Sequence, residues 1–197
     1  LSKNLFSQEV QKPEFSGYMN EMFSMFTENL DDSWYWQNIV HNRLTFGWQP
    51  GECWRIDAGI RNRLFSGDFL DIPGYAKRME TDNGYMDLSW NIMDEKNALL
   101  NLTCDRLYFT FEKGRWCLKL GRQRVNWGQT FVWNANDLFN SYSFFDFDYI
   151  ERPGCDAFRG TYYHDETSFS EVVVSLDNSK KVTAAFLHHG TIKNFDF

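Results

Sequence analysis

The chain has 197 residues and a formal net charge of −7, and 18% of its residues are aromatic although its mean hydropathy is −0.53. The acidic balance argues against a nucleic-acid-binding surface, which needs clustered basic charge. No stretch reaches the roughly 18 apolar residues of a membrane-spanning helix. Transmembrane strands need only about ten alternating residues each, so the sequence does not exclude a protein that crosses the membrane with strands.

The N-terminal part of the chain predicts a tail followed by one strand. Residues 1–13 are polar and end at Pro13, and they show no cationic start with an apolar run, so we expect a mature or trimmed chain. Residues 14–26 carry aromatic side chains and methionines in imperfect alternation, which makes them the first strand candidate.

The next two segments, 33–48 and 52–65, alternate with a period of two, which places their apolar and polar side chains on opposite faces of a sheet. The apolar side chains are Trp34, Trp36, Val40, Leu44, Phe46 and Trp48 in the first segment and Trp54, Ile56, Ala58, Ile60 and Leu64 in the second. The opposite face carries Tyr35, Gln37, His41, Arg43 and Thr45, then Arg55, Asp57, Gly59, Arg61 and Arg63.

Two long connections separate the remaining strand candidates. Residues 66–101 form the first, in which 85–93 is predicted to be a strand that extends beyond the membrane rather than a separate membrane strand. Residues 127–153 form the second, and we expect it to fold inward as a constriction. The further candidates are 102–112, 115–126, 154–164, 168–176 and 181–192, which brings the total to about eight strands.

Three regularities favour a barrel over a soluble sandwich. All four prolines lie outside the strands, as continuous ladders require. Short turns alternate with long connections, the usual arrangement of periplasmic turns and surface loops. Trp48, Trp54 and Trp116 lie near the short turns while Trp34, Trp36 and Trp127 lie at the opposite ends, which predicts two interfacial girdles. We therefore expect an all-β fold, an antiparallel transmembrane β-barrel, with a soluble carbohydrate-binding β-sandwich as the competing interpretation.

The four cysteines do not predict disulfides in this arrangement. Cys53 and Cys117 lie at one level, Cys104 and Cys155 at the other, and each pair is separated by an intervening strand. Two strand spacings put such a pair about 10 Å apart, whereas a disulfide needs Cα atoms within about 7 Å. We expect free thiols, and no cysteine or histidine spacing indicates a metal site.

Residues 120–159 contain motifs that resemble those of a known protein family. The residues that carry it are Gly121-Arg122-Gln123, Asn126-Trp127-Gly128, Trp133-Asn134, Asn136-Asp137 and Arg152-Pro153-Gly154. This stretch resembles large outer-membrane β-barrels of the porin and alginate-export type, over about 105–163 and faintly elsewhere. The resemblance implies a barrel in the outer membrane of a Gram-negative cell, in contact with its lipid and lipopolysaccharide.

Family members of this type have about twice as many residues and strands, so the resemblance implies an N-terminal portion of a larger barrel. In that reading residues 1–13 are a periplasmic tail and 14–197 are barrel strands with surface loops at 66–101 and 127–153. The partners would then be the remaining strands or the barrel-assembly machinery, because open strand edges are not tolerated in lipid. A complete eight-stranded barrel is the alternative, since Phe195-Asp196-Phe197 resembles the end of a final strand.

Strict alternation of faces gives an unfavourable result at the Gly121-Arg122-Gln123 motif. Trp116, Leu118 and Leu120 face lipid, so strict alternation would also turn Arg122 and Arg124 outward, at about 2–4 kcal/mol each at mid-bilayer. A bulge at Gly121 would turn both arginines into the lumen. Alternatively, both arginines lie above the membrane and no bulge is needed.

The polar face predicts the function. Ten of the 20 basic residues but only five of the 27 acidic ones lie in the five clearest strand windows. The residues expected to line the lumen are Arg43, Arg55, Asp57, Arg61, Arg63, Arg106, Lys119, Arg122, Arg124 and Arg159. An arginine-lined lumen favours anionic solutes such as carboxylates or acidic sugars, which indicates a porin-like channel.

Two other functions stay open. A non-conducting barrel anchor, or an incomplete barrel held by the assembly machinery, would use the same strands without a pore. Catalysis is not expected, because His188-His189 alternates across a strand and His164-Asp165-Glu166 lies in a tight turn. We expect no cofactor, no metal and no nucleic-acid partner.

Overall fold

The structure of the chain, a computed structural model, describes residues 12–27, 29–30, 33–127, 138–139, 154–192 and 195–196. The predicted tail at 1–13 and the connection at 127–153 therefore lie mostly outside the described residues. Most described residues belong to one antiparallel sheet, so the all-β expectation is confirmed.

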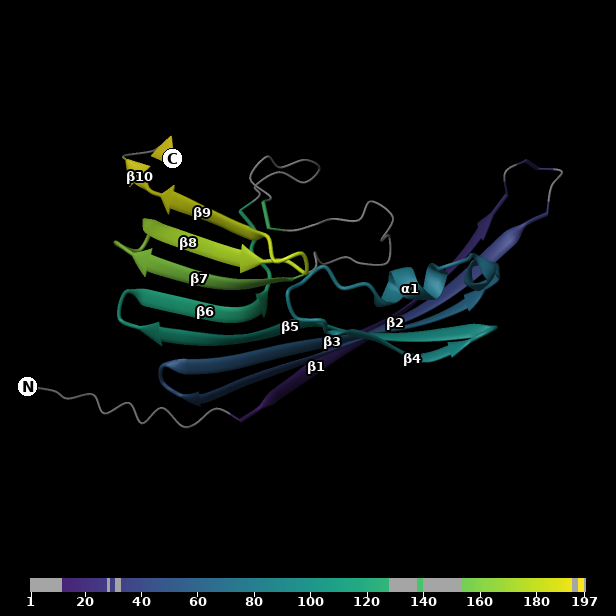
Figure 1. Cartoon of the computed structure of the whole chain (residues 1–197). Helices are drawn as coiled ribbons and strands as arrows, with labels where there is room; N and C mark the ends of the chain where they lie inside the picture. Colours follow the sequence, from purple (N-terminus) through teal and green to yellow (C-terminus); the bar gives the residue numbers. More distant parts are fainter. Residues whose placement is uncertain are drawn as a thin grey trace, which may run out of the picture.

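Eight strands follow one another across the sheet (Figure 1). They are β1 (Glu14–Phe26), β2 (Tyr35–Gly51), β3 (Trp54–Gly67), β5 (Ala98–Lys113), β6 (Trp116–Gln123), β7 (Cys155–Tyr163), β8 (Phe169–Leu176) and β9 (Val182–His189). Every neighbouring pair is antiparallel. Among the described residues β1 and β9 do not pair with each other, so the sheet is open rather than closed on itself.

One more strand lies beside this path. β4 (Ser89–Glu95) pairs only with the first part of β5, while β6 pairs with the last part of the same edge. The strand expected within 85–93 is therefore present in part, as β4, and it is not one of the eight. Two short strands, β10 (Thr191–Ile192) and β11 (Phe195–Asp196), form a separate ribbon.

Alternation gives the sheet two chemically different faces. The outer face carries large apolar side chains that stay exposed, among them Phe15 at 79%, Leu44 at 53% and Leu120 at 61%. The inner face carries charged side chains that are buried, among them Arg43, Arg61 and Arg63. This polarity is the reverse of a soluble protein, which buries its apolar side chains and exposes its charges.

The hairpin turns between β2 and β3, β5 and β6, and β7 and β8 all lie at the left end of the molecule in Figure 1. Aromatic side chains lie close to these turns on the outer face. Trp54 contacts Phe109 and Phe111 with ring centroids 4.8 and 4.4 Å apart, and Trp116 lies 4.8 Å from Tyr162.

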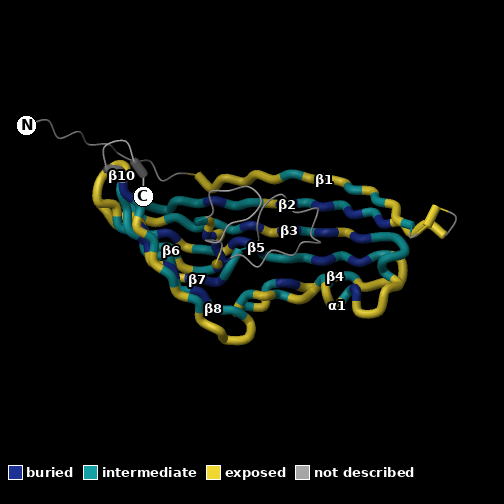
Figure 2. The backbone as a smooth tube through the Cα atoms, turned by 90° about the horizontal axis from the view of Figure 1, so that it is seen from above, coloured by how far each residue is buried: buried dark blue, intermediate teal, exposed yellow. Residues whose placement is uncertain are grey.

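The connection from β3 to β5 is more structured than the sequence predicts. It contains a 3₁₀ helix η1 (Asp68–Asp71), a short helix α1 (Tyr75–Glu80) and β4, and β5 begins at Ala98. Tyr75 packs with Ile39, Phe65 and Leu99 in a buried apolar cluster on the inner face. Figure 2 shows α1 beside β4, at the end of the molecule away from the hairpin turns.

A second apolar cluster covers the inner face of β7 and β8. It contains Val125, Phe139, Ala157 and Val173, with Trp127 packed against it. Trp127 was expected in an outer girdle, but its Nε1 donates to Glu171 Oε1 at 2.5 Å, so that expectation is wrong. The chain turns inward after β6, which local alternation cannot predict.

All four cysteines are described and all are free thiols. β5 separates Cys53 from Cys117 and β6 separates Cys104 from Cys155, as the predicted strand order requires. No helix in the described ranges is long and apolar enough to cross a membrane.

Candidate functional site: the charged inner face and the Arg122 junction

The inner face brings charged residues from six strands together. β2 contributes Arg43, β3 contributes Arg55, Asp57, Arg61 and Arg63, β5 contributes Asp105 and Arg106, β6 contributes Lys119, β7 contributes Arg159, and β8 contributes Glu171. Basic side chains outnumber acidic ones in this set.

A β-bulge places both Asp105 and Arg106 on the inner face. Gly59 pairs with Arg106 and Ile60 with Cys104, so Asp105 is the extra residue of β5. Strict alternation would turn Asp105 outward, but it is 3% exposed and lies 3.2 Å from Arg43 Nη2. Its carboxylate also lies 3.7 Å from Arg106 Nη1, so one acid compensates two arginines.

Gly59 makes room for this group. A Cβ at Gly59 would lie 3.0 Å from Asp105 Oδ1, 3.2 Å from Arg106 Cβ and 3.3 Å from Arg43 Nη2. Three separate atoms of the cluster therefore crowd the position that a side chain would take.

The neighbouring arginines of β3 have different surroundings. Arg63 Nη2 donates to Asn101 Oδ1 at 3.1 Å, and its guanidinium lies 5.3 Å from the ring centre of Phe65. Arg61 is buried on the same face of β3 as Arg63. Arg55, nearer the hairpin turn and 41% exposed, pairs with Asp57 at 3.0 Å.

A second ion pair joins β7 and β8. Arg159 Nη2 lies 2.6 Å from Glu171 Oε2, and the hydroxyl of Thr161 donates to the same carboxylate at 2.9 Å. Lys119 stands next to this group, with its Nζ 5.5 Å from the ring centre of Tyr108. This half of the inner face is therefore charged but largely compensated.

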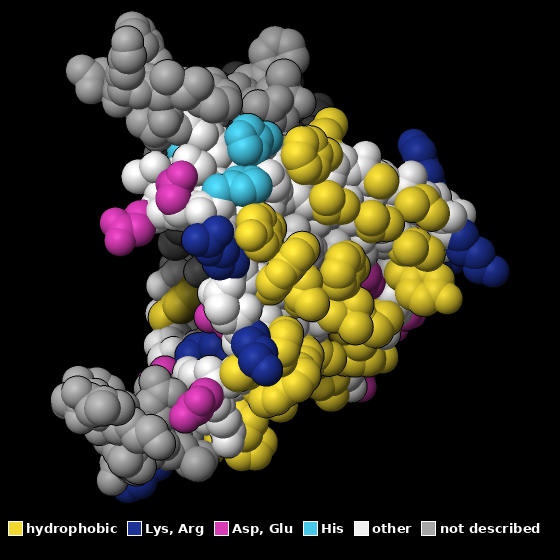
Figure 3. Space-filling view, turned by 90° about the vertical axis from the view of Figure 1, so that its left-hand side faces the viewer, with side chains coloured by type: hydrophobic (Ala, Val, Ile, Leu, Met, Phe, Trp, Pro, Cys, Tyr) yellow, Lys and Arg dark blue, Asp and Glu magenta, His cyan; other side chains and the backbone are white. Residues whose placement is uncertain are grey.

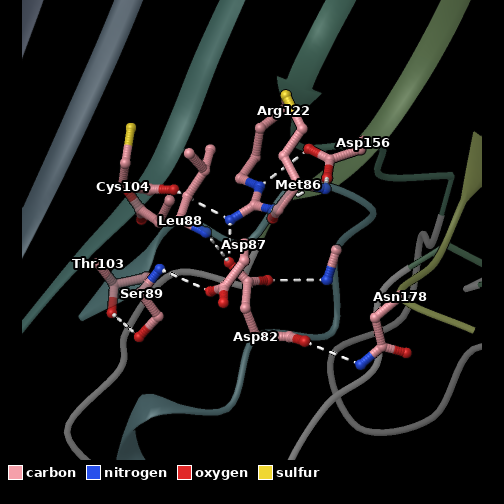
Figure 4. Close-up of polar contacts among 12 residues, drawn as sticks. Asp82, Met86, Asp87, Leu88, Ser89, Thr103, Cys104, Arg122, Asp156 and Asn178 are labelled. Atoms are coloured by element: carbon pink, nitrogen blue, oxygen red, sulfur yellow. Dashed lines mark hydrogen bonds and ion pairs between the residues drawn. The ribbon is translucent and has the colours of Figure 1, made fainter. Parts of the chain in front are cut away.

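Arg122, at the end of β6, is the centre of a separate buried network (Figure 4). Its Nε and Nη2 donate to the two carboxylate oxygens of Asp156 at 2.9 Å each, and its Nη1 lies 2.5 Å from Asp82. Nη2 also donates to the carbonyl oxygen of Met86 at 2.5 Å and Nη1 to that of Cys104 at 3.3 Å. One guanidinium thus joins β5, β6, β7 and the segment before β4.

That segment, residues 82–88, crosses the gap between β4 and β6 along the edge of β5. The amide of Cys104 donates to the carbonyl of Leu88 at 2.8 Å, and the amide of Met86 donates to Asp156 Oδ2 at 2.8 Å. Asp82 accepts from the amides of Gly84 and Leu88 at 2.8 and 2.9 Å. The gap is therefore filled by backbone and by the Arg122 network, which we call the Arg122 junction.

Glycines allow the chain to come this close. A Cβ at Gly84 would lie 2.0 Å from Arg122 Nη2 and 2.6 Å from Asp156 Oδ2. Gly121 has φ +117°, and a Cβ there would lie 2.3 Å from the carbonyl oxygen of Leu107. Only glycine fits these two positions without a shift of neighbouring atoms.

The predicted bulge at Gly121 is not present. β6 pairs with β5 in unbroken register from Trp116 to Arg122, and the positive φ of Gly121 is the irregularity instead. Arg122 is buried in its junction, whereas Arg124 is exposed beyond the end of β6. The two arginines, expected to share one environment, have opposite ones.

The structure therefore groups eight of the ten predicted lumen residues on the inner face and separates Arg122 and Arg124 from them. Whether a solute contacts them stays a prediction. Sequence reasoning missed Asp105, because it lies in a bulge, and Asp82 with Asp156, because the connection of Asp82 had no predicted partner.

One further group was missed on the outer face. Ser170 Oγ lies 2.7 Å from His164 Nε2 and 2.9 Å from His188 Nδ1, and the two imidazole rings are 5.5 Å apart. Ser170 pairs directly with His188 across β8 and β9, so the strand register would have revealed that contact. Figure 3 shows histidine side chains at the margin of the hydrophobic field.

Within the described ranges, no group of three or more histidine, cysteine, aspartate or glutamate side chains could hold a metal ion. Comparison with known proteins finds no matching family model, no similar curated protein and no similar solved structure.

Proposed function

We propose that this chain forms part of the wall of an outer-membrane β-barrel of the porin type, whose inner face guides anionic solutes. The observation that carries the proposal is the reversed polarity of the sheet. Hydrophobic side chains form a broad field on one face, with charged side chains mainly along its margins (Figure 3). Exposed apolar areas of this extent are rare on soluble monomers and are the normal surface of a protein in lipid.

Two asparagines on the outer face of β2 and β3 are hydrogen-bonded within the protein. Asn62 Nδ2 donates to Asn42 Oδ1 at 3.3 Å, and Asn42 Nδ2 donates to the carbonyl oxygen of Tyr18 at 3.1 Å. Hydrogen bonds of this kind lower the cost of placing amides in an apolar medium.

Strand length also supports a membrane setting. β2 has 17 residues and β3 has 14. About 9–11 tilted residues cross a bilayer. Both strands would therefore span it and protrude on the side of the long connections, where η1 and α1 lie.

The preference for anions follows from the excess of basic residues on the inner face. Such a surface raises the local concentration of carboxylates and acidic sugars. A soluble carbohydrate-binding sandwich is a weaker candidate, because the described residues form one large sheet and a two-stranded ribbon rather than two packed sheets.

Reversal potentials in planar bilayers test the proposal. The full chain, reconstituted across a KCl gradient, is expected to conduct with anion preference. Lys119→Glu should shift the reversal potential toward cations, because Lys119 lies on the inner face, while Lys113→Glu at the end of β5, beside the hairpin turn, should not. A cation-preferring wild type would contradict the proposal.

A second candidate is a non-conducting anchor or an unfinished barrel held by the assembly machinery. The open sheet favours it, since β1 and β9 each have one unpaired edge among the described residues. A membrane-inserted chain without conductance in the same experiment would support this candidate.

A further inference from the structure

The connection between β3 and β5 folds over the inner face instead of extending away from the sheet. Phe69, Leu70, Ala76 and Met79 pack against the cluster formed by Ile39, Phe65, Tyr75 and Leu99. Ile39 shares its side of β2 with Arg43, and Phe65 shares its side of β3 with Arg61 and Arg63, by the period of two. The insert, defined here as residues 68–88, therefore covers one end of the charged face.

Polar contacts hold the insert at both of its ends. At its start, Asp68 accepts from the amide of Trp36 at 3.0 Å, and Gln37 Nε2 donates to the hydroxyl of Tyr75 at 2.6 Å. At its end, Asp82 is bound in the Arg122 junction. Because contacts hold the insert at both ends, it is fixed in one position over the inner face.

Helix α1 presents two positive charges away from the sheet. Tyr75, Ala76 and Met79 pack against the sheet. Lys77 and Arg78 therefore lie on the opposite side of the helix, where both are exposed. Glu80 is turned toward β4, with its Oε1 3.5 Å from the amide nitrogen of Asn91. In the described part of the chain neither Lys77 nor Arg78 forms an ion pair, whereas Arg43, Arg122 and Arg159 all do.

We infer that the insert is a fixed constriction at the mouth of the passage and that Lys77 and Arg78 determine its preference for carboxylate-bearing solutes. This inference rests on the proposed function. The arginines deeper on the inner face are partly compensated by Asp105, Asp57 and Glu171, so exposed charges on α1 contribute strongly to the field that an entering anion meets.

Charge reversal tests the role of the two side chains. The variant Lys77→Glu/Arg78→Glu is compared with Lys96→Glu/Lys181→Glu, which changes the net charge equally at two exposed positions outside the insert. In the full chain reconstituted in bilayers, the anion-to-cation permeability ratio should fall about tenfold in the first variant, the lower end of what focused charge produces. The second variant should keep the wild-type ratio.

The outcomes separate the inference from the proposed function. An anion-preferring wild type with an unchanged ratio in Lys77→Glu/Arg78→Glu overturns the inference and leaves the channel proposal intact. A wild type that prefers cations or does not conduct overturns both.

A second variant tests the fixed position of the insert. Gly84→Ala places a Cβ against Arg122 in the junction, whereas Gly51→Ala meets nothing closer than 4.0 Å. We expect Gly84→Ala to raise single-channel conductance and weaken anion preference with the strand signal in circular dichroism unchanged. Wild-type conductance and selectivity in a folded Gly84→Ala chain would overturn the fixed constriction.

Discussion

The guanidinium of Arg122 is 3% exposed, so its charge has lost nearly all contact with water and must be compensated within the protein. Two carboxylates do this from different parts of the chain, Asp156 on β7 and Asp82 in the insert. Because the partners are far apart in sequence, the junction forms only when β6, β7 and the insert have reached their places. Its loss should therefore destabilise the sheet and release the insert together.

Arg122→Leu tests this at the level of one residue. It leaves two buried carboxylates without their cation, which costs about 3–5 kcal/mol of unfolding free energy. Arg124→Leu, two positions along and exposed, should change stability by less than about 0.5 kcal/mol. Urea unfolding in detergent micelles measures both, and equal stabilities would contradict the role of the junction.

Asp165 gives a pH-dependent prediction in the turn between β7 and β8. Hydrogen bonds from the amide and hydroxyl of Thr167, with further bonds from Ser168, lower the pKa of the Asp165 carboxyl below its ordinary value. The contribution of Asp165 to turn stability is thus fully present above the ordinary carboxyl pKa and is lost as pH falls through the lowered value.

Carboxyl NMR titration checks this expectation. Asp165 should titrate below the ordinary range in the wild type and move back toward it in Thr167→Ala, which removes the hydroxyl donor. A midpoint that is the same in both proteins would show that this hydroxyl does not contribute.

At the scale of elements, the strands follow from alternation and the irregularities do not. Segments such as 14–26 were located correctly because side chains of a strand alternate whatever its neighbours are. The bulge at Asp105 and the positive φ of Gly121 depend on what lies across the ladder. α1 was missed because six residues show too little helical periodicity to stand out, and its packing on Ile39 comes from a distant strand.

The outer face of β6 allows a direct test of the membrane setting. Leu120→Arg, on a side chain that is 61% exposed, should cost about 2–4 kcal/mol in lipid and reduce membrane insertion. Leu30→Arg, at an 83% exposed position between β1 and β2, should be tolerated. Flotation with vesicles measures insertion. If Leu120→Arg is equally tolerated, the outer face is solvated and the barrel proposal fails.

At the scale of the whole molecule, the most consequential feature is that the sheet is open. β1 pairs only with β2 among the described residues, and its outer side chains, such as Met19 at 71%, are among the most exposed. A strand edge inside a bilayer leaves backbone groups without partners, which costs several kcal/mol per group. In the membrane we therefore expect the edges of β1 and β9 to be covered by further strands.

Photo-crosslinking tests this expectation. A photoreactive residue at Met19 on β1, which faces outward beside the open edge, should crosslink to protein as well as to lipid, and the protein is either another strand of the barrel or a component of the assembly machinery. The same residue at Leu120, in the middle of the sheet, should give lipid adducts. Lipid adducts alone at both positions would contradict a covered edge.

The sequence by itself determined the strands, their two faces and the chemical character of each face, because the period of two is a local property of an extended chain. It also located most of the inner-face arginines. Only the tertiary structure decided that Asp105 turns inward, that Trp127 lies inside, that Arg122 joins β6 to β5, β7 and the insert while Arg124 does not, and that the insert covers the inner face. Each of these depends on contacts between residues far apart in the chain, and no local pattern encodes such contacts.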